Sequence, residues 1–215
     1  MPVQRDELRR FLASATAPVR TLDELVHAAP VREARWSLDE LRGRLVEISA
    51  RGAAATLTTA IELVAEAQQQ SEPVAWIARD SGTFYPPDVA DSGVDLAALV
   101  VVRVASISSI AAVRAAERLL RSGAFGFVVI DDLVELSIAS QGRLVTLAQT
   151  HDAAIACLTR KPDDAASLGS LVSLRAEALR RRGAGDFEIA VRALKDKRRG
   201  PGWTYVAKRR GPAGL

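Results

Sequence analysis

Short apolar runs alternate with amphipathic stretches through the middle of the chain. The runs that predict buried strands, rich in aliphatic and β-branched residues, are 45–48, 74–77, 100–105 and 126–130. Apolar positions recur at helical spacing over 56–70 and 110–120, between successive runs. Strands that alternate with helices are typical of an α/β fold, so we expect a mostly parallel sheet flanked by helices on both faces.

The pattern changes towards the end of the chain. Three strand-like stretches follow one another there without a helix between them, at 173–180, 187–194 and 202–207. Glycine-rich turns at 183–185 and 200–201 separate them. Strands joined by short turns pair in antiparallel fashion, so we expect an antiparallel C-terminal end to the sheet.

The beginning of the chain carries an amphipathic helical pattern of its own. We expect an N-terminal helical segment, a core domain and a tail, at residues 1–35, 36–210 and 211–215. Leu8, Phe11 and Leu12 share one face of the predicted N-terminal helix. This apolar stripe either packs on the chain's own core or docks in a groove of a partner protein.

The first predicted strand and helix are joined by a loop with the layout of a phosphate-binding loop. A working loop reads G-x-x-x-x-G-K-[ST]: its glycines let backbone N–H groups surround the phosphates, its lysine neutralises them, and its hydroxyl holds Mg²⁺. Here residues 50–57 read ARGAAATL. Ala50 and Ala55 replace the two glycines, Thr56 replaces the lysine, and Leu57 replaces the hydroxyl, while Gly52 remains. We therefore expect a degenerate nucleotide site and no bound cofactor.

The order of several motifs over residues 36–205 resembles RecA. Residues 45–68 resemble its first strand, P-loop and helix, and 127–131 resemble its Walker B strand, with Asp131 as the acid. Asp80 falls about where RecA carries its catalytic glutamate. Further similar stretches are 74–77, 92–95, 115–123 and 194–197. The chain therefore resembles RecA paralogues of the ImuA type, small RecA-like accessory proteins associated with mutagenic translesion polymerases.

The resemblance implies a role in which the chain is not an enzyme. The two long loops with which RecA-type recombinases contact DNA are short or missing here, at 133–142 and 161–170. Thr159 and Arg160 stand where RecA carries a nucleotide-sensing glutamine. Without a phosphate cradle, Asp131 would repel a triphosphate, so we expect this acid to be a relic satisfied by helix N-termini or solvent.

The function implied is that of an accessory protein in the DNA damage response and in translesion synthesis. The implied partners are RecA, a subunit of a Y-family polymerase, or another copy of the chain. Three alternatives remain open at this point: a module that binds single-stranded DNA, a cell-division inhibitor of the SulA type, and an ATPase with an unorthodox loop.

Positive charge gathers near the C-terminus. Residues 175–210 carry a net charge of +8 within a chain whose overall charge is +3. The candidate residues for binding single-stranded nucleic acid or a partner protein are Lys195, Lys197, Arg198, Arg199, Trp203, Lys208, Arg209 and Arg210. Phosphate contacts and aromatic stacking would hold single-stranded DNA there. The same charges would equally protect a solvated sheet edge from aggregation.

Composition favours a compact cytoplasmic protein. With 215 residues, of which 48% are hydrophobic, the chain can bury one α/β core. The single cysteine, Cys157, lies in an apolar run and is expected to be a core side chain, which fits a reducing compartment. The longest apolar stretch, around 96–102, is far too short to span a membrane. His27 and His151 lack clustered ligands, so we expect no metal.

Overall fold

The structure is a computed structural model, and it describes residues 35–52, 54–79, 84–104, 109–182 and 186–210. The N-terminal stripe of Leu8, Phe11 and Leu12 lies outside the described residues, as do Asp80 and the tail of residues 211–215. The roles expected for them stay predictions.

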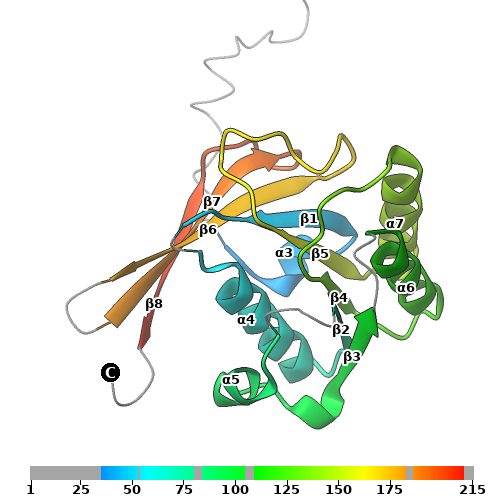
Figure 1. Ribbon diagram of the computed structural model, residues 1–215, viewed down its shortest axis with the longest axis horizontal. Coiled ribbons are helices and arrows are strands. Elements are labelled where there is room, and N and C mark those ends of the chain that lie inside the picture. Colours follow the sequence, from blue (N-terminus) through cyan, green and yellow to red (C-terminus); the bar gives the residue numbers. More distant parts are fainter. Residues whose placement is uncertain (1–34, 53, 80–83, 105–108, 183–185, 211–215) are drawn as a thin grey trace, which may run out of the picture. The chain divides into compact units, whose positions relative to one another are not determined.

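The described residues form a sheet of eight strands (Figure 1). In spatial order these are β3 (Leu99–Val104), β2 (Val74–Arg79), β4 (Phe127–Ile130), β5 (Ala154–Thr159), β1 (Arg44–Ser49), β6 (Leu174–Arg182), β7 (Asp186–Asp196) and β8 (Thr204–Arg210). Neighbouring strands from β3 to β6 are parallel, whereas β7 and β8 pair in antiparallel fashion.

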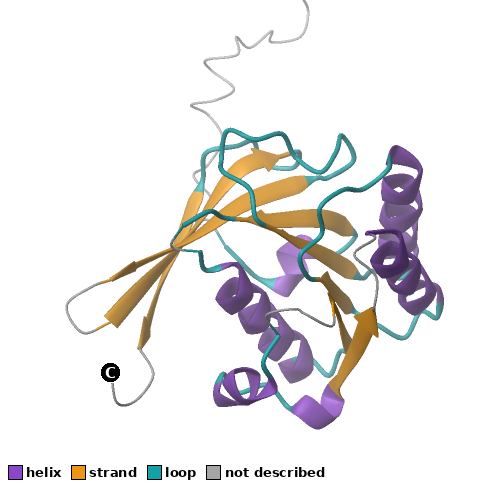
Figure 2. Ribbon diagram, in the orientation of Figure 1, coloured by secondary structure: helices purple, strands orange, loops and turns teal. Residues whose placement is uncertain are grey.

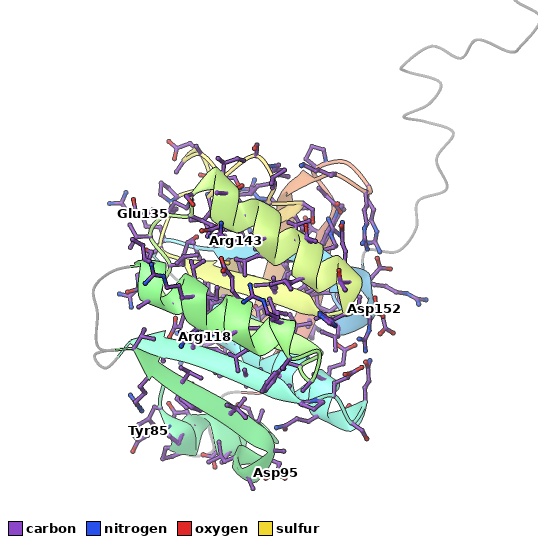
Figure 3. The ribbon with its side chains drawn as sticks, turned by 90° about the vertical axis from the view of Figure 1, so that its right-hand side faces the viewer. Tyr85, Asp95, Arg118, Glu135, Arg143 and Asp152 are labelled. Carbon is purple, nitrogen blue, oxygen red and sulfur yellow. The ribbon has the colours of Figure 1, made fainter. Side chains whose placement is uncertain are left out.

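Helices cover both faces of the parallel part (Figure 2). They are α3 (Leu38–Leu41), α4 (Thr56–Gln69), α5 (Pro86–Asp91), the short 3₁₀ helix η1 (Leu96–Ala98), α6 (Ser109–Arg121) and α7 (Ile138–Thr150). Figure 3 shows α6 and α7 side by side on one face, and α4 packs on the other. The expected α/β architecture, with mostly parallel strands and an antiparallel C-terminal end, is confirmed.

Each parallel strand supplies side chains to two separate apolar layers. In β2, Trp76 packs in the layer of α4, whereas the next residue, Ile77, packs in the layer of α6 and α7. In β4, Val129 and Ile130 divide in the same way. All four side chains are fully buried. Burial on both faces explains why β4, and β2 over residues 74–78, are apolar throughout.

The helix α7 begins earlier than the sequence pattern predicts. The pattern places a connection over 133–142 and a helix from residue 143, whereas α7 begins at Ile138. Ser137 caps it, because its side-chain oxygen accepts a hydrogen bond from the backbone N–H of Ser140 at 3.2 Å. Gly142 lies inside the helix, where a glycine weakens a helical pattern. The connection after β4 is therefore shorter still than expected.

Candidate functional site at the carboxyl ends of the parallel strands

The carboxyl ends of β1, β4 and β5 open on one cavity of about 530 Å³. Parallel strands present their carboxyl ends at the same edge of a sheet, where α/β proteins bind ligands. The residues of the degenerate site that line the cavity are Ala50, Gly52, Thr56, Leu57 and Asp131, and Ala55 lies buried at the start of α4. The structure thus brings together these residues, which the sequence places about 80 positions apart.

The loop between β1 and α4 is closed on its own backbone. The N–H of Ala54 donates to the carbonyl of Gly52 at 2.8 Å, and the N–H of Ala55 donates to the carbonyl of Ala178 on β6 at 2.9 Å. An isolated bridge pairs Ala54 with Leu179. Gly52 has a φ of 80°, the left-handed conformation that glycine adopts without strain. Two amides that a working loop would aim at phosphates are therefore occupied.

Asp131 borders this cavity and is buried, and one of its carboxylate oxygens has no hydrogen bond within the geometric limits. Its side chain is 7% exposed, and its Oδ2 atom has no hydrogen-bond partner among the described residues. Burial raises the pKa of its carboxyl, and the neighbouring Asp132 raises it further, while Arg160 offsets part of the effect. Hydrogen bonds from the backbone N–H of Asp132 and from Trp76 also lower the pKa of this carboxyl. The expectation that helix N-termini or solvent satisfy the acid stays a prediction.

Three arginines line the same cavity, and the sequence analysis proposed none of them as a binding residue. They are Arg51 in the loop, Arg160 after β5 and Arg180 near the end of β6. Arg160 lies 3.5 Å from Asp132, and the guanidinium of Arg180 lies 5.0 Å from the centre of the Phe187 ring. For Arg180, only the strand order shows that β6 lies beside β1 and its loop, so spacing along the chain gave no signal.

The basic turn after β7 is held to the rest of the fold by its own side chains. The Nζ atom of Lys195 donates to the carbonyl of Gly169 at 3.1 Å, and burial lowers the pKa of this lysine. Arg198 donates to the carbonyl of Arg42 at 3.0 Å. Lys197 is exposed. These hydrogen bonds hold the side chains of Lys195 and Arg198 against the fold, while both keep their positive charge.

Arg199 and Trp203 also make contacts within the chain. Arg199 lies 2.6 Å from the carboxylate of Glu40 and 5.6 Å from the centre of the Trp203 ring. The indole N–H of Trp203 donates to Asp196 at 3.0 Å. The indole is therefore engaged in the fold rather than standing free as a stacking platform.

The two basic groups of this hairpin lie at its opposite ends. β8 runs from Thr204, beside the basic turn, to Arg210, which pairs with Asp186 at the far end of β7. Lys208 is exposed, and Arg209 forms an ion pair with Glu62 of α4. The hairpin therefore does not join its charges into one patch, and whether either end binds DNA or a partner stays a prediction.

A buried carboxylate in β1 organises the connection between β5 and β6. Glu47 is fully buried, and its carboxylate lies 2.7 Å from the Nζ atom of Lys161. It accepts hydrogen bonds from the hydroxyl of Ser167 at 2.9 Å and from the N–H of Leu168 at 2.8 Å. Arg175 lies 3.8 Å away. This one side chain thus contacts the connection between β5 and β6 at both its beginning and its later part.

A second buried charge of β1 fixes the turn after β7. Arg44 donates to the carboxylate of Asp196 at 2.6 Å, and both side chains are at most 3% exposed. Asp196 also accepts hydrogen bonds from the N–H of Arg198 at 2.9 Å and from Trp203. The basic turn is therefore anchored to the central strand.

The two edges of the sheet differ in character. β3 ends the sheet on one side, and its Val100 and Val101 side chains are 44% and 37% exposed. β8 ends it on the other side, where Lys208 and Arg209 follow the exposed Val206. Lysine and arginine on an edge strand discourage pairing with another chain, whereas an apolar edge invites it. Within the part of the chain that the structure describes, β3 is the less protected edge.

The remaining candidate residues have structural roles. Cys157 is buried in the core as expected, and burial raises the pKa of its thiol. His151 is the C-cap of α7. The described residues contain no group of three or more side chains that could hold a metal ion. None of their helices is long and apolar enough to cross a membrane.

No protein-family model matches the chain, and no curated protein matches its sequence. Its function is therefore inferred from its own residues and their arrangement.

Proposed function

We propose that the chain is a non-enzymatic, RecA-like accessory protein of the DNA damage response and translesion synthesis. It acts by binding RecA, a subunit of a Y-family polymerase, or both. The observation that carries this proposal is the closed loop after β1. The loop lies where a phosphate-binding loop would, but the N–H groups of Ala54 and Ala55 donate to carbonyls of the chain itself.

The arrangement around the loop supports a RecA-like core. The loop follows the central strand β1, the Walker B-like acid Asp131 follows β4, and both line one cavity. The strand β5 lies between these two strands. The chain thus keeps the framework of a nucleotide site, while the residues at 50–57 lack the charge that holds phosphates.

The apolar edge strand β3 supports a role in protein association. An edge strand offers unpaired backbone donors and acceptors, and an extended segment of another chain can add to it as a further strand. The side chains of Val100 and Val101 would be covered by such an addition. The exposed Leu96 in η1, which directly precedes β3, extends the apolar surface.

We expect no measurable ATP binding at physiological concentrations. The donors of Ala54 and Ala55 are occupied, and Thr56 supplies no charge at the lysine position. Isothermal titration calorimetry with Mg·ATP checks this. Binding in the micromolar range, or ATP turnover that disappears in Asp131→Ala, would contradict the proposal.

Placing a lysine on the apolar edge is expected to weaken partner binding. In Val100→Lys, the partner segment that adds to β3 would have to cover a charged side chain. The affinity for the partner should therefore fall by at least about tenfold. Pull-down and biolayer interferometry against RecA and the Y-family polymerase subunit of the same organism measure this. The matched control is Val206→Lys, which makes the same change on the opposite edge strand.

Three results would count against these assignments. Failure of the wild-type chain to bind either partner defeats the proposed function. Equal losses in Val100→Lys and Val206→Lys would remove β3 as the contact. A lower melting temperature in Val100→Lys alone would show that the valine supports the fold instead.

A further inference from the structure

The antiparallel end of the sheet has one face that the described helices leave uncovered. Alternate residues of β6 and β7, such as Ala178, Ile189 and Val191, pack in the layer of α4. The described residues of β6, β7 and β8 supply no side chain to the layer of α6 and α7. Their outer face, which points away from α4, is hollowed by a groove of about 430 Å³. Figure 2 shows the ends of these strands projecting beyond the helices.

An apolar row crosses the middle of the outer face. Residues directly opposite each other in an antiparallel pair point to the same face of the sheet. The register places Leu179 of β6 opposite Ala190 of β7, and Ala190 opposite Val206 of β8. All three residues line the groove, and Val206 is 51% exposed. Covering this row with another apolar surface would remove it from water, which is favourable.

Two rows that contain charged side chains border the apolar row, one on each side. By register, the first row is Glu177, Arg192 and Thr204, and the second is Arg181, Glu188 and Lys208. Arg192 lies 2.8 Å from Glu177, yet its side chain is 48% exposed. Glu188 forms no ion pair with another described residue. Three cations stand against two carboxylates, so the face lacks the excess of positive charge that binds nucleic-acid phosphates.

The order of these charges suits a second copy of the same face in one orientation. Two identical sheets that pack face to face with aligned strands are related by a two-fold axis that runs across the strands or along them. With the axis across the strands, the apolar rows meet, Arg192 faces the partner's Glu188, and Glu177 faces the partner's Arg181. With the axis along the strands, Arg192 and Glu188 each face their own counterparts, and Arg181 faces the partner's Lys208. Only the first orientation brings opposite charges together.

We propose that the chain forms a homodimer through the outer face of β6, β7 and β8. The two apolar rows pack on each other, and Arg192 of each protomer pairs with the partner's Glu188. The face is only three strands wide, with strands about 5 Å apart. Such a small interface makes a weak dimer, so we expect a dissociation constant of about 10–100 µM. The dimer leaves β3 free at the opposite edge of the sheet, so it does not depend on the proposed function.

Sedimentation equilibrium of the full chain measures the dimer and the effect of single substitutions. Val206→Lys places a charge in the apolar row, and Glu188→Arg brings like charges face to face twice. Each should weaken dimerisation by at least about tenfold. The matched control is Val134→Lys, because Val134 is also an exposed valine, 67% exposed, but lies outside this face. Its dissociation constant should equal that of the wild type.

Mixing two charge-reversed variants tests the pairing across the interface. Glu188→Arg and Arg192→Glu should each be monomeric alone, whereas their mixture should form a heterodimer within about tenfold of the wild-type affinity, because opposite charges face each other again. Arg192→Glu also loses its pair with Glu177, so the melting temperature of each variant is measured.

Cross-linking tests the orientation without charge reversal. Val206→Cys should link to itself through a short bis-maleimide, since Val206 faces the partner's Val206 only when the axis runs across the strands. The natural cysteine, Cys157, is buried and should not react. Val134→Cys is the control and should not link.

Four results would overturn the proposal. The chain could stay monomeric up to about 1 mM, or Val134→Lys could weaken the dimer as much as Val206→Lys does. Folded Glu188→Arg and Arg192→Glu could fail to associate when mixed. A monomeric wild type whose melting temperature falls in Val206→Lys would show that another segment of the chain covers this face. Binding of RecA or of the polymerase subunit, or its absence, leaves the result unchanged, because that contact is assigned to β3.

Discussion

The substitution Glu47→Ala is expected to destabilise the fold by about 3–5 kcal/mol. It would leave Lys161 and Arg175 near a cavity without their counter-charge. It would also leave the partly buried hydrogen-bond donors of Ser167 and Leu168 without an acceptor. Equilibrium unfolding in urea measures the change in the free energy of unfolding.

Two further variants separate charge from shape. Glu47→Gln keeps the size of the side chain and should cost less than the alanine variant. Glu135→Ala is the control, because Glu135 is an exposed glutamate near the start of α7 (Figure 3), and removing it should change stability by less than about 0.5 kcal/mol. A loss of under 1 kcal/mol in Glu47→Ala would show that the network does not hold this loop.

The substitution Asp196→Ala is expected to cost about 3–5 kcal/mol as well, and more than Arg44→Ala. Removing the aspartate leaves three donors without their acceptor: the guanidinium of Arg44, the N–H of Arg198 and the indole of Trp203. Removing the arginine leaves the aspartate with two of its donors. Urea unfolding of both variants checks the order, and a larger loss in Arg44→Ala would contradict it.

The same aspartate should make stability depend on pH. Burial alone would raise the pKa of its carboxyl, but hydrogen bonds from Arg198, Arg44 and Trp203 outweigh burial, so the pKa lies below its ordinary value. A carboxyl of this kind contributes fully above its unfolded-state pKa of about 3.9, and its contribution is lost as the pH falls through the lower folded-state value. Asp196→Asn should therefore lose less stability than the wild type below about pH 4.

An exposed ion pair shows how much less stability is lost when an ion pair outside the buried networks of Glu47 and Asp196 is broken. Arg143 on α7 lies 2.8 Å from Glu117 on α6, and its side chain is 51% exposed. Figure 3 shows it at the junction of the two helices. Arg143→Ala should cost less than about 1 kcal/mol, since water screens such a pair. A cost similar to that of Asp196→Ala would show that burial is not what distinguishes the networks.

Elements whose residues are buried on both faces could be predicted from the sequence. The apolar run at 126–130 corresponds to β4, and the helical spacing at 110–120 corresponds to α6. The short helices α3 and α5 have too few turns to show a periodic apolar pattern, so the sequence does not predict them. The N-terminal boundary of α7 depends on the cap at Ser137, which apolar spacing does not report.

The site was predictable in its residues but not in its contacts. The substitutions at 50–57 are visible in the sequence, whereas the hydrogen bond from Ala55 to Ala178 depends on the position of β6 beside β1. Glu47 passed unnoticed because a charged residue in an apolar strand is seldom fully buried. Its partners follow more than 110 residues later, where no local pattern links them to it.

The charges of β1 also affect the order in which the protein can be completed. Arg44 meets a partner 152 residues further along the chain, and β1 pairs only with β5 and β6. During synthesis this strand emerges early, with a cation and an anion that stay unpaired until most of the chain has followed. Contacts between residues so far apart form slowly, because the entropy of closing a long loop is lost before the contact stabilises the fold. Until then the nascent strand β1 is exposed to misassembly, so its completion depends on β5, β6 and β7.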